Sequence, residues 1–310
     1  MACGREVESG PAVGVWAAEL PEAEVEPFHA VALGADAGVS VAGFPETEDA
    51  SVVAFLVDPY TFPAAPFLDR LNDERPGLPV VGGLAVGGER GESALIVDDE
   101  IVDEGGVGAV VSGTPVLTLV SQGCRSFGRE AVITAAEGNV VHELAGEPAF
   151  DRLRDDIAAL PPAERALVTR GLLAGLVIDE NRADYGLGDF LMRGLLGADE
   201  ETGAIAIGAP VRVGQTLRFH VRDAASADED LRRTLAEGLI GRRPAGALLF
   251  TCNGRGSDLF GAPDHDARLV SEALGGPALA GFFCGGEIGP VGGKSFLHGF
   301  TATLAVFLER

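Results

Sequence analysis

Two stretches of this chain follow the same order of elements, and that order restricts the fold most. Each stretch reads as a short apolar strand, an amphipathic helix, a glycine-rich strand and a further strand. The first copy consists of residues 51–57, 67–71, 78–83 and 107–112. The second copy consists of residues 247–252, 266–274, 277–284 and 298–308. We therefore predict an α/β fold of two related, pseudo-symmetric halves with mixed sheets, arranged as packed sheets flanked by helices.

The length of 310 residues exceeds the usual size of one domain, so we expect two. An apolar run over residues 172–178 precedes Asp179, and we place the boundary there, with domains at residues 1–178 and 179–310. Residues 179–187 can also be interpreted as a loop within one continuous body.

The charge balance excludes several classes of partner. A formal net charge of -24 gives a strongly acidic surface that repels phosphate backbones and anionic membranes. We expect no nucleic-acid partner. No stretch approaches the roughly 18 apolar residues of a spanning helix, and no apolar signal region follows the N-terminus, so we expect neither membrane insertion nor export.

The chain has four cysteines and no CxxC pair, which favours reduced thiols in a cytoplasmic protein over a disulfide framework or a structural zinc site. We therefore expect a cytoplasmic protein without a bound metal.

The first candidate site follows the strand over residues 247–252. Cys252, Asn253, Gly254, Arg255 and Gly256 combine a thiol, an amide and a guanidinium with glycines that allow close backbone approach. The arginine fork suits a carboxylate, and a nearby cation also stabilises a thiolate. In the structural alternative Cys252 is a small buried hydrophobe and Arg255 pairs with an acidic residue.

The second candidate site follows the strand over residues 277–284. Cys284, Gly286 and Glu287 repeat the pattern of a thiol, glycine and a charged group. Glu287 is interpreted as a ligand for an amine, as a partner of Arg255, or as a general base. His298 is a candidate proton shuttle or ligand contact, or a hydrogen-bonded structural group.

Further candidates lie outside these two motifs. Cys124 and Arg125 form a third glycine-flanked thiol with an arginine neighbour, and Arg193 is a second candidate for holding an anion. We predict that Cys124 and Arg125 close the site from the other half of the protein.

At these motifs the chain resembles the FIST family, which pairs a FIST N with a FIST C domain. The FIST C likeness is carried by residues 188–193, 219–224, 252–256, 286–290 and 298–303. The looser FIST N likeness is carried by residues 79–83, 123–125 and 137–139. Ser126 stands where the family commonly has a proline, which leaves the loop geometry there less defined.

The resemblance implies a cytoplasmic sensory module for a small molecule, with amino acids or related metabolites as proposed ligands and haem reported for some members. The 310 residues leave no room for a kinase, cyclase or F-box, so we expect a stand-alone FIST protein. Its output would be a separate signalling protein or a change in self-association. The cofactor and the oligomeric state are not specified by the sequence.

Three functions remain open. In the leading one, a ligand lies between the two domains, its carboxylate held by Arg255 and Arg193 and its ammonium by Glu287. The second is a cysteine-dependent hydrolase or amidase with Cys252 as nucleophile, His298 as base and Glu287 as orienting group. The third is a pure interaction module that binds a protein through the acidic face. Haem is an alternative ligand for the sensor, with His298 as its first candidate ligand.

Overall fold

The computed structural model describes the chain except residues 35–39, 88–93, 170, 187, 277 and 310. It divides into two compact units. Unit 1 comprises residues 1–121 and 232–310, and unit 2 comprises residues 122–231. The division at residues 178 and 179 refers to the family's two domains and stays a prediction.

Unit 1 contains two mixed sheets, and the first is built mainly from the N-terminal part of the chain. Its strand order is β19-β18-β4-β3-β7-β1-β2. Strands β3 and β4 are parallel and are joined by helix α1, which buries Phe67, Leu68 and Leu71 as the helical spacing predicts. The bounds are β1 Glu24–Leu33, β2 Ser40–Ala42, β3 Ala50–Val57, α1 Ala64–Glu74, β4 Val80–Leu84, β7 Gly106–Ser112, β18 Glu287–Val291 and β19 Lys294–His298. A separate hairpin is formed by β5 Leu95–Val97 and β6 Glu100–Val102.

The second sheet has the order β17-β16-β20-β8, and β16 and β17 are again parallel with helices between them in the chain. Its elements are β8 Val116–Ser121, β16 Pro244–Cys252, α5 Ser257–Phe260, α6 His265–Leu274, β17 Ala278–Cys284 and β20 Ala302–Leu308. The predicted first residue of β17, Pro277, lies outside the described residues. The predicted strand over 298–308 is divided: His298 ends β19 and β20 begins at Ala302. Phe300, with φ of 66°, lies in the turn where the chain passes from one sheet to the other.

The two sheets confirm the repeated order expected from the sequence. The run β4-β3-β7-β1 has the same pattern of one parallel and two antiparallel pairs as β17-β16-β20-β8. The hairpin β18–β19, from the C-terminal part, joins the first sheet because β18 pairs with β4. Residues far apart in the sequence therefore meet at one edge of β4.

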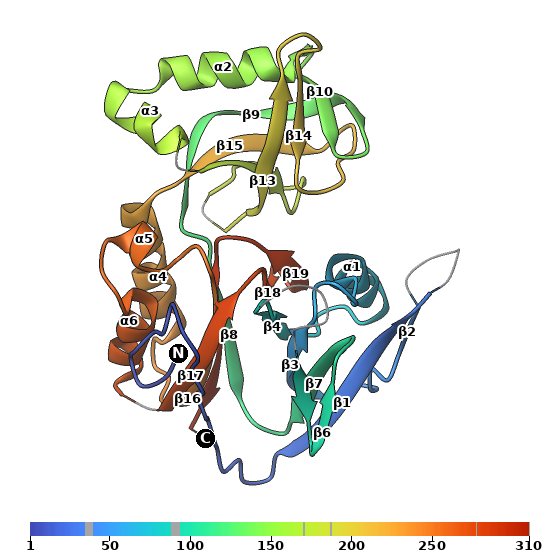
Figure 1. Ribbon diagram of the computed structural model, residues 1–310, viewed down its shortest axis with the longest axis vertical. Coiled ribbons are helices and arrows are strands. Elements are labelled where there is room, and N and C mark those ends of the chain that lie inside the picture. Colours follow the sequence, from blue (N-terminus) through green and yellow to red (C-terminus); the bar gives the residue numbers. More distant parts are fainter. Residues whose placement is uncertain (35–39, 88–93, 170, 187, 277, 310) are drawn as a thin grey trace. The chain divides into compact units, whose positions relative to one another are not determined.

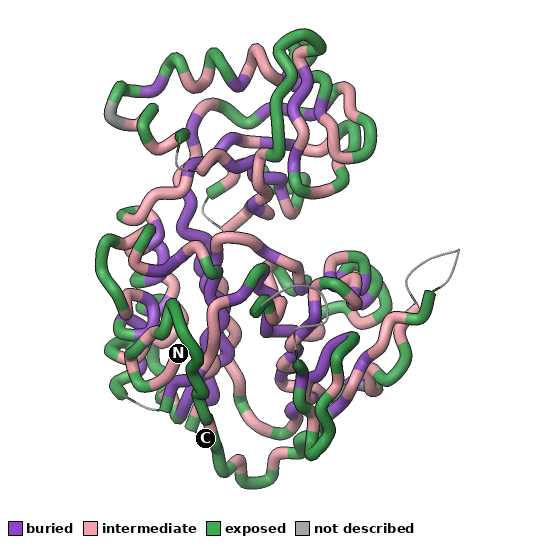
Figure 2. Tube along the Cα trace, viewed as in Figure 1, coloured by how far each residue is buried: buried purple, intermediate pink, exposed green. Residues whose placement is uncertain are grey.

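Unit 1 is layered, with the two sheets between helices (Figure 1). Along β3, Val53, Phe55 and Val57 belong to the core under α1. Val52, one residue before Val53, belongs with Phe250 and Phe307 of the second sheet to the core between the sheets. Alternating side chains of a strand point to opposite faces, so β3 serves both cores. In Figure 2 the strands at the centre of unit 1 are coloured mainly as buried and intermediate residues.

Unit 2 is an antiparallel sheet with helices α2 and α3, and its strand order is β11-β10-β14-β13-β12-β15-β9. Its core includes Ile133, Leu144, Leu153 and Phe219. The bounds are β9 Cys124–Glu137, β10 Val140–Leu144, β11 Glu147–Pro148, α2 Ala149–Ala159, α3 Pro162–Val168, β12 Leu172–Val177, β13 Phe190–Asp199, β14 Ala204–Ile207 and β15 Thr216–Arg222. Helix α4, Ala224–Gly238, contains the division between the units. No helix of the described residues has the length and apolar character to cross a membrane.

Candidate functional site

The two thiol motifs of unit 1 are neighbours. Cys252 and Cys284 are direct register partners at the carboxyl ends of the parallel strands β16 and β17. Both side chains are buried, with 5% and 0% of their surface exposed. The structure therefore brings together the two strand ends that the sequence singles out.

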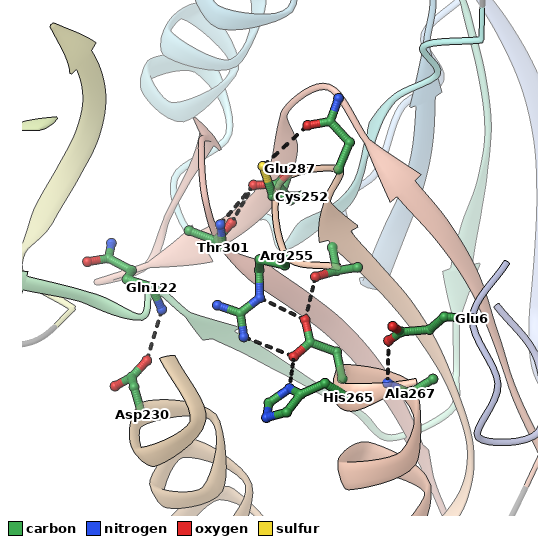
Figure 3. A network of polar contacts seen from close by, with 12 residues as sticks. Glu6, Gln122, Asp230, Cys252, Arg255, His265, Ala267, Glu287 and Thr301 are labelled. Atoms are coloured by element: carbon green, nitrogen blue, oxygen red, sulfur yellow. Dashed lines mark hydrogen bonds and ion pairs between the residues drawn. The ribbon is translucent and has the colours of Figure 1, made fainter. Parts of the chain in front are cut away.

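Glu287 lies beside these thiols, at the start of β18 and opposite Gly83 of β4. Its carboxylate is fully buried. Oε2 accepts hydrogen bonds from the Thr301 backbone N–H at 3.0 Å and from Thr301 Oγ1 at 2.8 Å (Figure 3). Oε1 receives no N–H or O–H donor from the described residues. Gly83 leaves room for this arrangement, because a Cβ there would lie 2.3 Å from Cys284 Sγ.

The burial of Glu287 changes its protonation. Burial raises the pKa of this carboxyl to about 7, although the Thr301 hydrogen bonds, the Arg255 charge and the Cys252 thiol act in the opposite direction. This carboxyl group therefore exchanges its proton near neutral pH. Burial, with the neighbouring Glu287 and Cys252, raises the pKa of the Cys284 thiol well above its ordinary value, so this thiol stays protonated and unreactive.

His298 is placed next to Glu287. The two residues are register partners in the hairpin β18–β19, so their side chains leave the sheet on the same face. The His298 ring is buried, and its Nε2 lies 2.9 Å from the Gly289 carbonyl oxygen. We call Cys252, Cys284, Glu287, His298 and Thr301 the Glu287 cluster. Gly286 adjoins it, and its carbonyl accepts a hydrogen bond from the Leu84 N–H at 2.8 Å.

Arg255 pairs with Asp266 of α6, and not with Glu287. Its Nε and Nη2 donate to the two Asp266 oxygens at 2.7 Å and 3.1 Å, and both side chains are buried (Figure 3). Thr251 Oγ1 also donates to Asp266 at 2.7 Å. Although burial opposes ionisation, the Arg255 charge and these hydrogen bonds hold the pKa of Asp266 well below its ordinary value. Two of the donors expected to hold a ligand carboxylate are thus used by Asp266.

The segment that follows Arg255 donates hydrogen bonds to a carboxylate of the same chain. Glu8 accepts hydrogen bonds from the Ser257 N–H at 2.9 Å and from Ser257 Oγ at 2.7 Å. Gly256 allows this approach, since a Cβ there would lie 2.5 Å from Glu8 Oε2. Asn253 N–H donates to the Cys284 carbonyl at 2.9 Å, which ties the residues before Gly254 to β17. Sequence reasoning missed Glu8, because no local pattern connects residues so distant along the chain.

The remaining candidates belong to unit 2. Cys124 is buried, Arg125 pairs with Glu164 at 2.7 Å, and Arg193 Nη1 donates to the Met192 carbonyl at 2.9 Å. Their predicted closure of a shared site stays a prediction.

Gln122 was not anticipated by the sequence reasoning. It is buried in unit 2, where its N–H donates to Asp230 at 2.9 Å (Figure 3). Its Nε2 donates to the Phe190 carbonyl at 2.6 Å.

The Glu287 cluster is suited to binding a ligand that donates hydrogen bonds. A buried carboxylate with one oxygen directed at no N–H or O–H group is suited to an ammonium or another donor. A thiol beside a carboxylate is also a pair of groups found in sites of nucleophilic catalysis, where a base activates the nucleophile. Within the part of the chain that the structure describes, no group of three or more His, Cys, Asp and Glu side chains is arranged to hold a metal ion.

Comparison with known proteins covers almost the whole chain. The FIST N domain model matches residues 2–147, and the FIST C domain model matches residues 149–290. Protein Rv0628c of Mycobacterium tuberculosis strain H37Rv is 47% identical over 308 residues, which cover 98% of this chain and 80% of the relative. Protein Mb0898c of Mycobacterium bovis is 47% identical over 307 residues, which cover 98% of this chain and 79% of the relative. Neither relative's name assigns an activity.

The segments matched by the FIST N and FIST C domain models pair with each other in the first sheet of unit 1. Gly83 belongs to the FIST N match and Glu287 to the FIST C match, and they are register partners in unit 1. The chain is therefore a member of the FIST family, whose domains are sensory domains implicated in small-ligand binding and signal transduction.

Proposed function

We propose that this protein senses a small metabolite that carries an ammonium group, an amino acid or a related compound, and that Glu287 holds that group. The observation that carries the proposal is Glu287 Oε1, which is fully buried and receives no N–H or O–H donor from the described residues. The neighbouring Cys252 thiol is only a weak donor to this carboxylate, and a bound ammonium would supply stronger, charge-assisted hydrogen bonds.

Several of the donors expected to bind a ligand carboxylate already have partners within the chain. Asp266 engages Nε and Nη2 of Arg255, and Glu8 engages Ser257. Arg255 therefore contributes through its charge, which favours the ionised form of Glu287. Amines and amino acids are accordingly both candidate ligands, and the carboxylate contacts proposed for Arg255 and Arg193 are a secondary feature.

A thermal-shift screen tests this function, because a ligand that binds the folded state raises its melting temperature. The panel contains the common amino acids, simple primary amines, the matching carboxylic acids that lack the amine, and haem. We expect some amine-bearing compounds to raise the melting temperature of the wild type and not of Glu287→Gln. The exposed Glu272→Gln serves as the matched control and should respond like the wild type. Equal shifts with the amine-free acids, or an unchanged response of Glu287→Gln, would contradict the proposal.

The geometry also favours a second candidate. Glu287 lies next to Cys252 and opposite His298, which are the groups of the cysteine-dependent hydrolase. Iodoacetamide labelling separates the two functions. The sensor requires no reactive thiol, and buried Cys252 should be alkylated more slowly than free cysteine. Rapid alkylation at neutral pH, together with loss of a hydrolytic activity in Cys252→Ser, would favour the enzyme.

The composition and the family support a proposal for where the sensor acts. We propose a cytoplasmic protein that transmits ligand binding to a separate signalling protein. Haem is the alternative ligand, with His298 as its first candidate. An absorption band of bound haem in purified or haem-treated protein, lost in His298→Ala, would establish that alternative.

A further inference from the structure

One end of the layer between the two sheets of unit 1 is hollow. The cavity has a volume of about 410 Å³ and lies between β3 and β7 of one sheet and β16 and β17 of the other. Next to the cavity, the same layer is filled by a cluster that includes the buried Val52, Val81 and Phe307. The hollow is therefore a local feature of a layer that is otherwise closely packed.

Small side chains explain the hollow. Ala54 and Ala109 are register partners on β3 and β7, and both line the cavity. Across the layer, Leu248 and Ala280 are register partners on β16 and β17. Packed sheets lie about 10 Å apart, and alanine side chains on facing strands cannot fill that distance. As a result the inward-facing Leu56 is only partly buried.

The edges of the cavity differ from its walls. Trp16 lines one edge, where its Nε1 donates to the Ala278 carbonyl at 3.2 Å. The hairpin β5–β6 contributes Ile96 and Asp98 at another edge. Asp98 is the only ionisable residue among the described residues that line the cavity, and it is exposed at the hairpin turn.

We propose that this cavity binds a hydrophobic amine, with its apolar body between the sheets and its ammonium group beside Asp98. A volume near 410 Å³ falls within the range of small-molecule sites, and apolar walls with few polar groups are typical of them. Trp16, Phe250 and Phe282 line the cavity and offer apolar surface to the body of such a ligand. The carboxylate of Asp98 and the net charge of -24 favour a cationic head and disfavour an anionic one.

The experiment uses Trp16, because it is the only tryptophan of the chain and lines the cavity. Its emission is followed while decylamine, decanol or decanoate is added below the concentration at which each forms micelles. We expect saturable changes with the amine and the alcohol, and decanoate as the weakest ligand. Because Asp98 is exposed, its attraction should favour the amine over the alcohol by about two- to fivefold.

Three variants make the test specific. Asp98→Asn keeps a residue that tolerates the positive φ of 52° at this turn, and it should remove the preference for the amine while binding decanol as before. Ala109→Leu places three additional carbon atoms in the cavity and should weaken binding of all three compounds at least about tenfold, since part of the space for their apolar body is lost. Glu287→Gln lies in the Glu287 cluster and should leave these titrations unchanged, which separates this site from the proposed sensory site.

Several results would overturn the inference. A linear, non-saturable change in Trp16 emission would show partitioning and no site. Decanoate binding as tightly as decylamine, or an Asp98→Asn variant that keeps the amine preference, would contradict the assigned head group. An Ala109→Leu variant that melts like the wild type and binds as tightly would place any binding elsewhere.

Discussion

Replacing Glu287 by glutamine should stabilise the protein above neutral pH. Glutamine has nearly the same shape, and its amide oxygen can still accept the two hydrogen bonds from Thr301. What it removes is an ionisable group whose pKa burial raises from 4.5 to about 7. The variant therefore isolates the effect of the charge from the effect of the packing.

The sign follows from proton binding. Between about pH 4.5 and 7, Glu287 is protonated in the folded state and ionised in the unfolded state, so the folded state binds more protons. Stability consequently falls as the pH rises through this window. The difference between the two pKa values corresponds to about 3 kcal/mol above pH 7, and it vanishes below about pH 4.5.

The assay is thermal or urea unfolding of wild type and Glu287→Gln at about pH 5 and pH 8. At the higher pH the variant should be more stable by up to about 3 kcal/mol, or roughly 6–12 °C in melting temperature for a body the size of unit 1. At the lower pH the two proteins should nearly coincide, and Glu272→Gln should follow the wild type throughout. A variant that is less stable at pH 8, or whose stability keeps the wild-type slope between the two pH values, would refute this reasoning. Binding residues often lower the stability of the folded state, and a buried carboxylate at neutral pH is an example of such a residue.

Three further predictions concern the scaffold of the site. Arg255→Ala should destabilise unit 1 by about 3–5 kcal/mol in urea unfolding, because Asp266 would be left buried without its partner, and a loss below about 1 kcal/mol would contradict the buried pair. Since the pKa of Asp266 is depressed, its stabilising contribution is present above about pH 4 and should be lost on acidification below that value, with Asp266→Asn less sensitive in the same acid titration. Gly281→Ala should destabilise by more than about 2 kcal/mol, since its Cβ would lie 1.7 Å from the Leu249 carbonyl oxygen; a wild-type melting temperature would argue against the pairing of β16 with β17.

The two copies of the repeated order in unit 1 are well predicted from the sequence, because the signals for their strands and helices are local. Apolar runs ending in glycine or proline identify β3, β4, β16 and β17, and helical spacing identifies α1. The transfer of β18–β19 to the first sheet was not predictable, because pairing with β4 depends on contacts across the whole chain. The same holds for unit 2, whose strands follow one another without a repeated signature.

The candidate site shows the same limit. The motifs identify Cys252, Cys284 and Glu287 because thiols, glycines and a charge at strand ends are visible in the sequence. The partner of Arg255 was beyond sequence reasoning, since Asp266 reads as an ordinary residue in the first turn of a helix. Its burial, which decides the role of Arg255, exists only once α6 packs on β16 and β17.

Proton release on ligand binding tests the central role of Glu287 most directly. The compound that stabilises the wild type most in the amino acid and amine panel is titrated by calorimetry at pH 7 in two buffers of different ionisation enthalpy. Because the pKa of Glu287 lies near this pH, pairing with an ammonium group should favour the ionised carboxylate and release a measurable fraction of a proton per ligand. Glu287→Gln should lose both the affinity and the release. Binding without proton release, or equal release by the Gln variant, would contradict Glu287 as the ammonium-binding group.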